Sequence, residues 1–252
     1  MASKTSNNTG RYLYAIVAAS ETHNYGTIGM DDSAVYTISE GGVSAVVSNV
    51  PNQKMRPERR HLAAHQAVLR RLMKEITPLP MSFGIIAEGD KAITRILSAN
   101  QEVFLKELRR VADKVEMGLR VTWDVPNIFE YFIQTHPELR TARDRCFGTH
   151  REPSHEEKLE VGRMFERMLN EDREAYTEKV EQILSEYCFE IKLNKSSKER
   201  EVMNLACLVG RKAQSQFEEG VFEAAKLFDN SFAFDYNGPW TPHNFVHIEL
   251  AL

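Results

Sequence analysis

The chain has 252 residues, of which 42% are hydrophobic and 27% charged, and its formal net charge is −4 at pH 7. This composition is typical of a soluble globular protein, and the length allows one large domain or two small ones. The weak negative charge provides no basic field for nucleic acid or an anionic membrane, and no apolar run reaches the ~18 residues of a membrane span. The three cysteines lack C-x-x-C spacing, which is typical of reduced thiols in a cytoplasm.

The first part of the chain predicts a tail, a strand and a hairpin. Residues 1–10 (MASKTSNNTG) lack the apolar core of a signal peptide, and we expect them to form a flexible tail. Residues 11–20 have the continuous apolar pattern of a buried strand. Residues 34–48 predict a β-hairpin, because Gly41 and Gly42 supply the positive φ angles of a tight turn.

Two helices with a strand between them follow. From about Glu58, apolar residues recur three or four positions apart, which predicts a one-faced helix that ends at Pro78 and Pro80. Residues 81–86 (MSFGII) predict a buried strand in which Phe83 belongs to the core. A second helix is indicated by apolar residues at helical spacing: Ile93, Ile96, Leu97, Phe104, Leu108 and Val111.

A different unit begins near residue 113. Residues 114–125 (KVEMGLRVTWDV) alternate apolar and polar side chains, which predicts a strand with one solvated face. A helical region follows, with a short helix in NIFEYFI and a long one from Glu156 to Tyr187. The remaining elements are two paired strands, a helix and a strand: CFEIKL, EVMNLACLV, QFEEGVFEAAKLF and SFAFDY. Their order, β-α-β-β-α-β, predicts a ferredoxin-like unit.

The expected fold class is therefore α+β with two domains. Residues 11–112 form the N-terminal α+β domain and residues 113–236 the ferredoxin-like domain. Residues 237–252 form a C-terminal tail that we expect to pack on the second domain, with the strand-like FVHIEL at its end.

The stretch FDYNGPWTPHNFVHI raises the choice between a ligand pocket and a stiff corner. Gly238 permits a turn, and Pro239 and Pro242 each fix a φ angle and remove a hydrogen-bond donor. Trp240 supplies a large apolar anchor. These properties favour the corner over the pocket.

Few residues suggest chemistry, because the sequence has no G-x-G-x-x-G, phosphate-binding loop or G-x-S-x-G motif. His61 and His65 lie four apart on the first predicted helix, a spacing that can hold one metal ion. The glutamate that a zinc protease needs beside the first histidine is replaced by Leu62, so buried structural histidines are the favoured reading. His243 and His247 are also four apart, but in a strand that spacing is about 13 Å.

Three phenylalanines of the last predicted helix, Phe217, Phe222 and Phe228, raise the possibility of base stacking in an RNA-binding ferredoxin-like domain. That mode places aromatic side chains on strands beside basic residues. Because these three lie on a helix of an acidic chain, we interpret them as core residues.

Four segments resemble the gas vesicle protein F/L family in the same order. They are YLYAIV (12–17), HLAAHQAVLRRLMKEITPLPMSFG (61–84), VMNLACLV (202–209) and FDYNGPWTPHNFV (234–246). The most specific pieces are LPMSFG, with Pro80, Phe83 and Gly84, and GPWTPHNFV. The chain departs from the usual family pattern at Ser82, Thr241 and His243.

The resemblance implies a gas vesicle protein without catalytic residues, cofactor or metal, located at the gas vesicle within the cytoplasm. Such proteins look like minor structural components or assembly factors that bind the small, very hydrophobic wall protein, together with other gas vesicle accessory proteins. Neither nucleic acid nor a lipid membrane is an expected partner. The ordinary charge indicates a bacterium with a low-salt cytoplasm, such as a cyanobacterium. The expected contact residues are Trp240, Phe245, Val246 and Ile248.

Two other classes stay open from the residues alone. One is a metal-dependent hydrolase that uses His61 and His65, which stoichiometric zinc in the purified protein would favour. The other is a ferredoxin-like module that binds a small ligand or RNA, which a basic and aromatic strand face would favour.

Overall fold

The computed structural model describes residues 9–18, 23–148, 152–195 and 198–251. Most of the predicted flexible tail, residues 1–8, lies outside this range. The chain forms two compact units: one contains the chain up to Glu116 together with the chain from Gly238 onward, and the other is Met117–Asn237. Within the described residues, no helix is long and apolar enough to cross a membrane.

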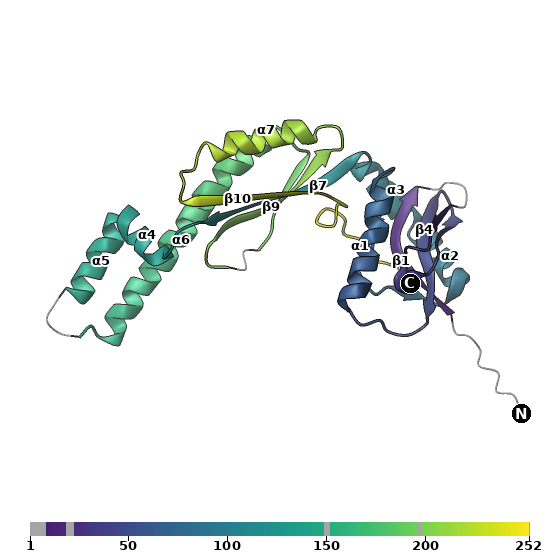
Figure 1. Ribbon diagram of the computed structural model, residues 1–252, viewed down its shortest axis with the longest axis horizontal. Helices are drawn as coiled ribbons and strands as arrows, with labels where there is room; N and C mark the ends of the chain where they lie inside the picture. Colours follow the sequence, from purple (N-terminus) through teal and green to yellow (C-terminus); the bar gives the residue numbers. More distant parts are fainter. Residues whose placement is uncertain (1–8, 19–22, 149–151, 196–197, 252) are drawn as a thin grey trace, which may run out of the picture. The chain divides into compact units, whose positions relative to one another are not determined.

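The first unit contains an antiparallel sheet in the order β2-β3-β4-β1-β5, with β6 also paired to β1. Its strands β1 and β4 are labelled in Figure 1. Its strands are β1 (Thr9–Ala18), β2 (Asn24–Gly26), β3 (Val35–Glu40), β4 (Val43–Pro51), β5 (Leu79–Pro80) and β6 (Ile86–Ala87). The predicted hairpin is confirmed, because β3 pairs with β4 around Gly41 and Gly42, whose φ angles are +57° and +87°.

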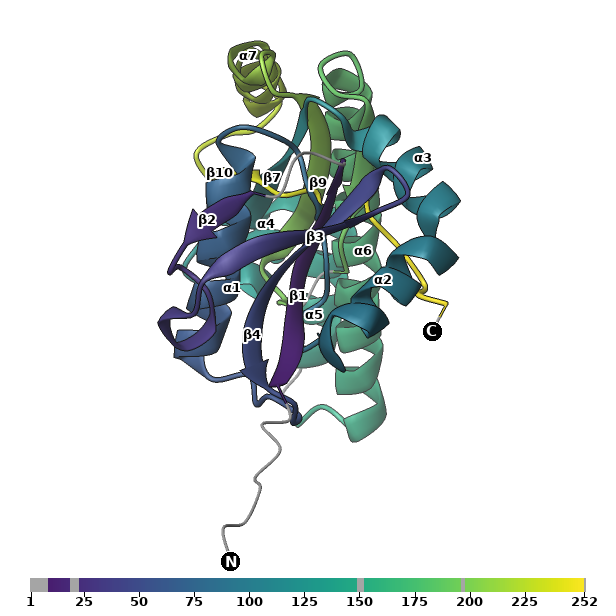
Figure 2. The same cartoon turned by 90° about the vertical axis from the view of Figure 1, so that its right-hand side faces the viewer.

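Helices cover both faces of this sheet, as Figure 2 shows: α1 (Arg59–Met73) lies on one side, and α2 (Gly89–Ala99) and α3 (Gln101–Val111) lie on the other. The central strand β1 is therefore buried on both faces. Tyr12 and Tyr14 pack with α1, whereas Leu13 and Ile16 pack with α2 and α3. This arrangement explains the continuous apolar pattern from which a buried strand was predicted. A short 3-10 helix, Met30–Asp32, completes the α1 side.

Three local predictions for this unit are wrong. The single helix predicted up to Val111 is two helices, because the chain breaks at Asn100, whose φ and ψ are −116° and 12°. Residues 81–85 connect β5 and β6 through a turn at Phe83 and Gly84, whose φ is +91°, so that only Ile86 lies in a strand. Phe83 is partly buried. The predicted apolar face of α1 includes Leu62, which is 43% exposed.

The second unit contains the sheet β10-β7-β9-β8, in which β8 and β10 are the terminal strands. Its elements follow one another in the predicted order, with three helices in the first helical region, and this strand order is compatible with a ferredoxin-like unit. The elements are β7 (Lys114–Trp123), α4 (Ile128–Thr135), α5 (Pro137–Phe147), α6 (His155–Leu184), β8 (Glu190–Leu193), β9 (Glu201–Gly210), α7 (Gln214–Ala225) and β10 (Phe232–Trp240). The helix α6 begins with a capping box between Ser154 and Glu157.

The alternation of β7 is confirmed, since Val115, Met117, Leu119, Val121 and Trp123 are all buried. Its one exception is Glu116, which is only 7% exposed where a solvated side chain was expected. Phe217 is a core residue as predicted, and Phe228 packs among Tyr176, Phe232 and Phe234. The core prediction for Phe222 is wrong, because this side chain is 64% exposed on α7.

Two further predictions, both about the C-terminal tail, are wrong. Gly238, Pro239 and Trp240 continue strand β10, and the residues beyond it form no strand, so FVHIEL is not the predicted strand. Beyond Trp240 the tail packs on the first unit and not, as predicted, on the second domain. Three of its apolar side chains lie against the core cluster that contains α2 and α3: Val246, Ile248 and Leu250. The sequence shows that the tail is apolar at alternate positions, but the surface it covers is set by distant residues.

Candidate functional site

The family-specific segments near the start and middle of the chain meet in one aromatic and histidine cluster. The hydroxyl of Tyr12 lies 2.9 Å from Nδ1 of His65, and it also accepts a hydrogen bond from the main-chain N–H of Gly84 at 3.1 Å. The ring of Phe83 lies 5.9 Å from that of Tyr12 and 6.0 Å from that of His65. Pro80 pairs with Ala15 in the sheet. LPMSFG therefore contributes to both faces of the sheet: Phe83 packs on the α1 side, whereas Leu79 and Met81 belong to the cluster with α2 and α3.

Burial sets the protonation of this cluster. His65 is 3% exposed, and burial together with the nearby His243 lowers its pKa to about 4. Burial also raises the pKa of Tyr12 and of Tyr14, whose hydroxyl is bonded to Ser48 and to the N–H of Met30. At neutral pH the cluster is uncharged, as its position in an apolar core requires.

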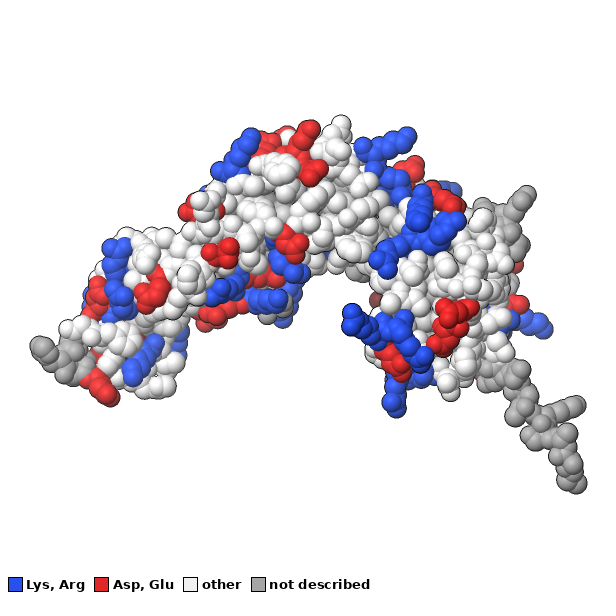
Figure 3. Space-filling view, in the orientation of Figure 1, with Lys and Arg blue, Asp and Glu red and all other residues white. Residues whose placement is uncertain are grey.

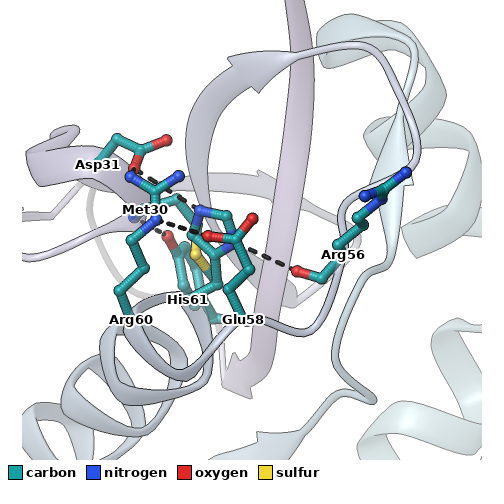
Figure 4. Close-up of polar contacts among 7 residues, drawn as sticks. Met30, Asp31, Arg56, Glu58, Arg60 and His61 are labelled. Carbon is teal, nitrogen blue, oxygen red and sulfur yellow. Dashed lines mark hydrogen bonds and ion pairs between the residues drawn. The ribbon is translucent and has the colours of Figure 1, made fainter.

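His61 lies about one helical turn before His65 in α1 and has different partners, shown in Figure 4. Its Nδ1 is 3.2 Å from the carbonyl oxygen of Arg56, and its Nε2 is 3.7 Å from a carboxylate oxygen of Asp31. That carboxylate also pairs with Arg60 at 3.3 Å, and Arg60 in turn pairs with Glu58 at 2.9 Å. A cavity of about 360 Å³ adjoins this charged network.

The two histidines are therefore held by separate protein partners and do not converge on one point. Among the described residues, no group of three or more His, Cys, Asp or Glu side chains could hold a metal ion. The described arrangement lacks the third ligand that a catalytic zinc site requires.

A more open surface lies on the second unit, between α6 and the terminal strand β8. We call it the α6–β8 groove. It consists of two adjoining cavities of about 580 and 270 Å³ that share Glu181. Its apolar lining comes from the residue before β8 and from β8 and β9: Phe189, Ile191, Leu193, Val202 and Met203. Its polar rim comes mainly from α6: Arg173, Glu174, Thr177, Glu178, Glu181 and Ser185.

Two large apolar side chains of this groove are strongly exposed. Phe189 is 66% exposed and Leu193 is 55% exposed, and both lie on the same face at the ends of β8, with Ile191 between them. The rim is of mixed charge, and Arg173 is engaged by the carbonyl oxygens of Lys198, Glu199 and Glu201. Figure 3 shows acidic and basic side chains interspersed over this unit on the face that it draws. The groove thus has the chemistry of a protein-binding surface with an apolar floor.

The residues of the C-terminal stretch that were predicted as partner contacts differ in their exposure. Trp240 is 42% exposed, so it is not the buried anchor that was predicted. Phe245 is 5% exposed, and Val246 and Ile248 are partly buried against the first unit's core. The carbonyl of Pro242 accepts hydrogen bonds from the main-chain N–H groups of Phe245 and Val246, both at 3.1 Å, which forms a compact turn after Trp240.

Sequence reasoning missed the α6–β8 groove and the polar contacts of the tail. The signal for the groove was the alternation of Phe189, Ile191 and Leu193 with Glu190 and Lys192, which marks an apolar face on a short strand. Nothing in the sequence shows that this strand ends the sheet, and exposure follows from that position.

Comparison with known proteins gives a consistent result. The model of the family described as "Gas vesicle synthesis protein GvpL/GvpF" matches residues 10–247. Gas vesicle protein F of Streptomyces sp. (strain CB03234) is 27% identical over 240 residues, which cover 93% of this chain and 98% of that relative.

Two crystal structures share the fold. GvpF from Anabaena sp. PCC7120 is 24% identical, with a TM-score of 0.84, and the match covers 96% of this chain and 99% of that chain. GvpF from Microcystis aeruginosa is 20% identical, with a TM-score of 0.78, and the match covers 95% and 99% respectively. These cyanobacterial structures confirm the α+β fold class. Because the family match extends over nearly the whole chain, this protein belongs to the gas vesicle GvpL/GvpF family and is a gas vesicle-associated protein.

Proposed function

We propose that this protein binds the hydrophobic wall protein of the gas vesicle and acts as a minor structural or assembly protein of the shell. Family membership supports the association with gas vesicles. The binding is our inference, and the observation that carries it is the α6–β8 groove, where Phe189 and Leu193 are 66% and 55% exposed beside a cavity of about 580 Å³.

The physical reason is the wall protein's need for shielding. A very hydrophobic subunit aggregates unless its apolar surface is covered before it joins the shell. Full burial of a side chain such as Phe189 or Leu193 contributes about 1.5–3 kcal/mol. Burial of these two exposed side chains therefore supplies binding energy without any change in the fold, whereas Val202 and Met203 are already buried and only shape the floor of the groove.

The rim adds a preference for the charge of the bound segment. Glu174, Glu178 and Glu181 lie four and three positions apart, so they form one stripe along the groove side of α6. A bound segment would place its Lys or Arg side chains toward this stripe. Such contacts mainly fix register and orientation.

The C-terminal residues are a second proposed contact. Trp240 is exposed and accessible to a partner. Phe245, Val246 and Ile248 are engaged with the first unit, so they are proposed contacts only for a state in which the tail leaves that position.

The test of the groove is a matched pair of variants. The double variant Phe189→Ser and Leu193→Ser should lower the affinity for purified wall protein by at least ~30-fold, because two apolar contacts of more than 1 kcal/mol each are lost. Phe222→Ser is the control, since Phe222 is 64% exposed on α7 and outside the groove. Pull-down and light scattering measure binding and aggregation. Equal binding by the double variant and the control would exclude the groove, and no binding by the unaltered protein would exclude the function.

We also propose that the protein acts at the gas vesicle within the cytoplasm, alongside other gas vesicle accessory proteins. An antibody against it, applied to intact, stripped and collapsed vesicles, separates the alternatives. Signal only after collapse indicates the inner surface. Signal that stripping removes indicates the outer surface. Absence from all three preparations together with presence in the soluble fraction indicates a transient assembly factor.

A further inference from the structure

The tail covers an apolar face of the first unit in a regular alternating manner. Val246, Ile248 and Leu250 are partly buried and pack against the cluster that contains Phe104 and Leu108 of α3. The residues between them, His247 and Glu249, are exposed. The tail therefore has the side-chain pattern of an extended segment with one apolar face.

Its main chain is held by side chains at the two ends of α3. Arg110, near the helix C-terminus, donates a hydrogen bond to the carbonyl oxygen of Phe245. Asn100, just before the helix, donates from its side-chain amide to the carbonyl oxygen of Ala251 at 2.9 Å and accepts from the N–H of Ala251 at 2.9 Å. The tail thus runs antiparallel to α3, and Figure 2 shows the yellow C-terminal segment beside this helix.

These polar contacts have an unusual property: they depend on the tail's backbone and not on its side chains. Asn100 is only 4% exposed, and its amide also donates to the carbonyl oxygen of Ile96 at 2.8 Å, so its orientation is fixed. It is therefore a preformed clamp for one residue of an extended chain. Any segment with aliphatic side chains at three alternate positions can satisfy the same contacts.

We propose that the surface under the tail, which we call the tail seat, is a binding surface for an extended segment of a partner protein, and that the tail is its internal competitor. The seat comprises Asn100, Arg110 and the apolar cluster against which Val246, Ile248 and Leu250 pack. The partner segment carries aliphatic side chains at alternate positions. The inference rests on the proposed function in one respect, because it takes the wall protein as the source of that segment.

Replacement of the tail is physically reasonable because residues 241–251 belong to no strand. The tail therefore does not have to break a ladder of backbone hydrogen bonds when it leaves. Its advantage is tethering, which gives an effective concentration in the millimolar range. A partner segment prevails when it is supplied at high local concentration, as the subunits of a growing shell are.

The test uses the full chain and a fluorescent peptide of residues 242–252 (PHNFVHIELAL) as the probe. The unaltered protein should bind the peptide weakly, because its own tail occupies the seat. The double variant Val246→Ser and Ile248→Ser weakens only the internal competitor, so it should bind the peptide at least ~10-fold more tightly. Adding Asn100→Ala to this variant should lower the affinity again by ~10-fold or more, because the clamp is lost.

A second variant guards against misfolding. Ala251→Pro removes the N–H that bonds to Asn100 without altering the apolar cluster, and it should also raise peptide binding. Equal peptide binding by the unaltered protein and by both tail variants, each folded by circular dichroism, would overturn the proposal.

Wall protein provides the last arm of the test. It should displace the labelled peptide from the Ala251→Pro variant, which retains Val246 and Ile248. If it fails to do so while the Phe189→Ser and Leu193→Ser substitutions still abolish wall binding, the seat does not bind the wall protein and the proposed function stands. If wall protein binds no form of the protein, the proposed function fails, whatever the peptide does.

Discussion

The carboxylate of Glu116 accepts two hydrogen bonds from Asn244: the main-chain N–H lies 2.8 Å from Oε2, and the side-chain nitrogen lies 2.6 Å from Oε1. The two residues are 128 positions apart in the chain. Glu116 is 7% exposed, and these two bonds contribute to compensating its buried charge. This pair explains both the burial of an acidic residue on β7 and the position of the tail on the first unit.

The first prediction concerns this pair. Asn244→Ala removes the side-chain donor from a buried carboxylate, and the free energy of unfolding should fall by about 1–3 kcal/mol. Glu249→Gln is the control on the same segment, because Glu249 is exposed, and it should change stability by less than about 0.5 kcal/mol. Urea unfolding measures both values. Identical midpoints for the two variants would show that the pair contributes nothing.

The second prediction is a loss of stability at mildly acidic pH. His65 has a pKa of about 4 in the folded protein, below the value of about 6.5 expected in the unfolded chain. The unfolded state therefore binds more protons between these values, so stability is fully present above about pH 6.5 and is lost as the pH falls toward 4. The shift corresponds to a loss on the order of 3 kcal/mol. Partial burial of its ring also lowers the pKa of His243, but its contribution to the pH dependence is smaller because the residue is exposed to solvent.

The variant His65→Gln tests the source of this pH dependence. Glutamine retains a hydrogen-bonding partner for Tyr12 but does not titrate, so the slope of stability between pH 6.5 and 4.5 should become smaller. His155→Gln, at an exposed position at the start of α6, should leave the slope unchanged. An unaltered slope in His65→Gln would assign the acid sensitivity to other groups.

The third prediction compares two phenylalanines. Phe104 is fully buried in the core cluster with α2 and α3, and Phe104→Ala should cost about 3–5 kcal/mol. Phe83 is partly buried beside Tyr12 and His65, so Phe83→Ala should cost less, about 1–3 kcal/mol. Val103→Ala is the control, because Val103 is 47% exposed next to Phe104. If Phe83→Ala proved as costly as Phe104→Ala, the turn around Phe83 would be a core element after all.

Local signals account for the parts of the fold that could be predicted. The hairpin at Gly41 and Gly42, the alternation of β7 and the order of elements in the second unit each depend on residues close together in the chain. The α+β class follows from these elements.

The remaining features depend on residues far apart. The chain breaks at Asn100 without a glycine or proline, and Asn100 bonds to Ala251, 151 positions away. The turn at Phe83 requires a positive φ at Gly84 and the hydroxyl of Tyr12. The glycine in MSFGII is a local signal for a turn, but nothing in the run indicates the distant Tyr12. The corner was predicted at Gly238–Trp240, but these residues continue β10 and the turn follows at Pro242. The position of the tail is set by Glu116, and no local pattern identifies that partner.

The last prediction follows from this connectivity. Met117–Asn237 is continuous in sequence, whereas the first unit is completed by the tail. A fragment from Lys114 to Trp240 includes the whole of β7 and β10, and it should fold cooperatively on its own. A fragment of residues 9–116 lacks Val246, Ile248 and Leu250 over its core and leaves Glu116 without Asn244. Its free energy of unfolding should therefore be lower by several kcal/mol than that of the same unit with the tail attached through a short linker.

Circular dichroism and urea unfolding of the three fragments measure this difference. Equal stability of the first unit with and without the tail would show that the tail contacts contribute no net stability, and an unfolded Lys114–Trp240 fragment would show that the two units share one core.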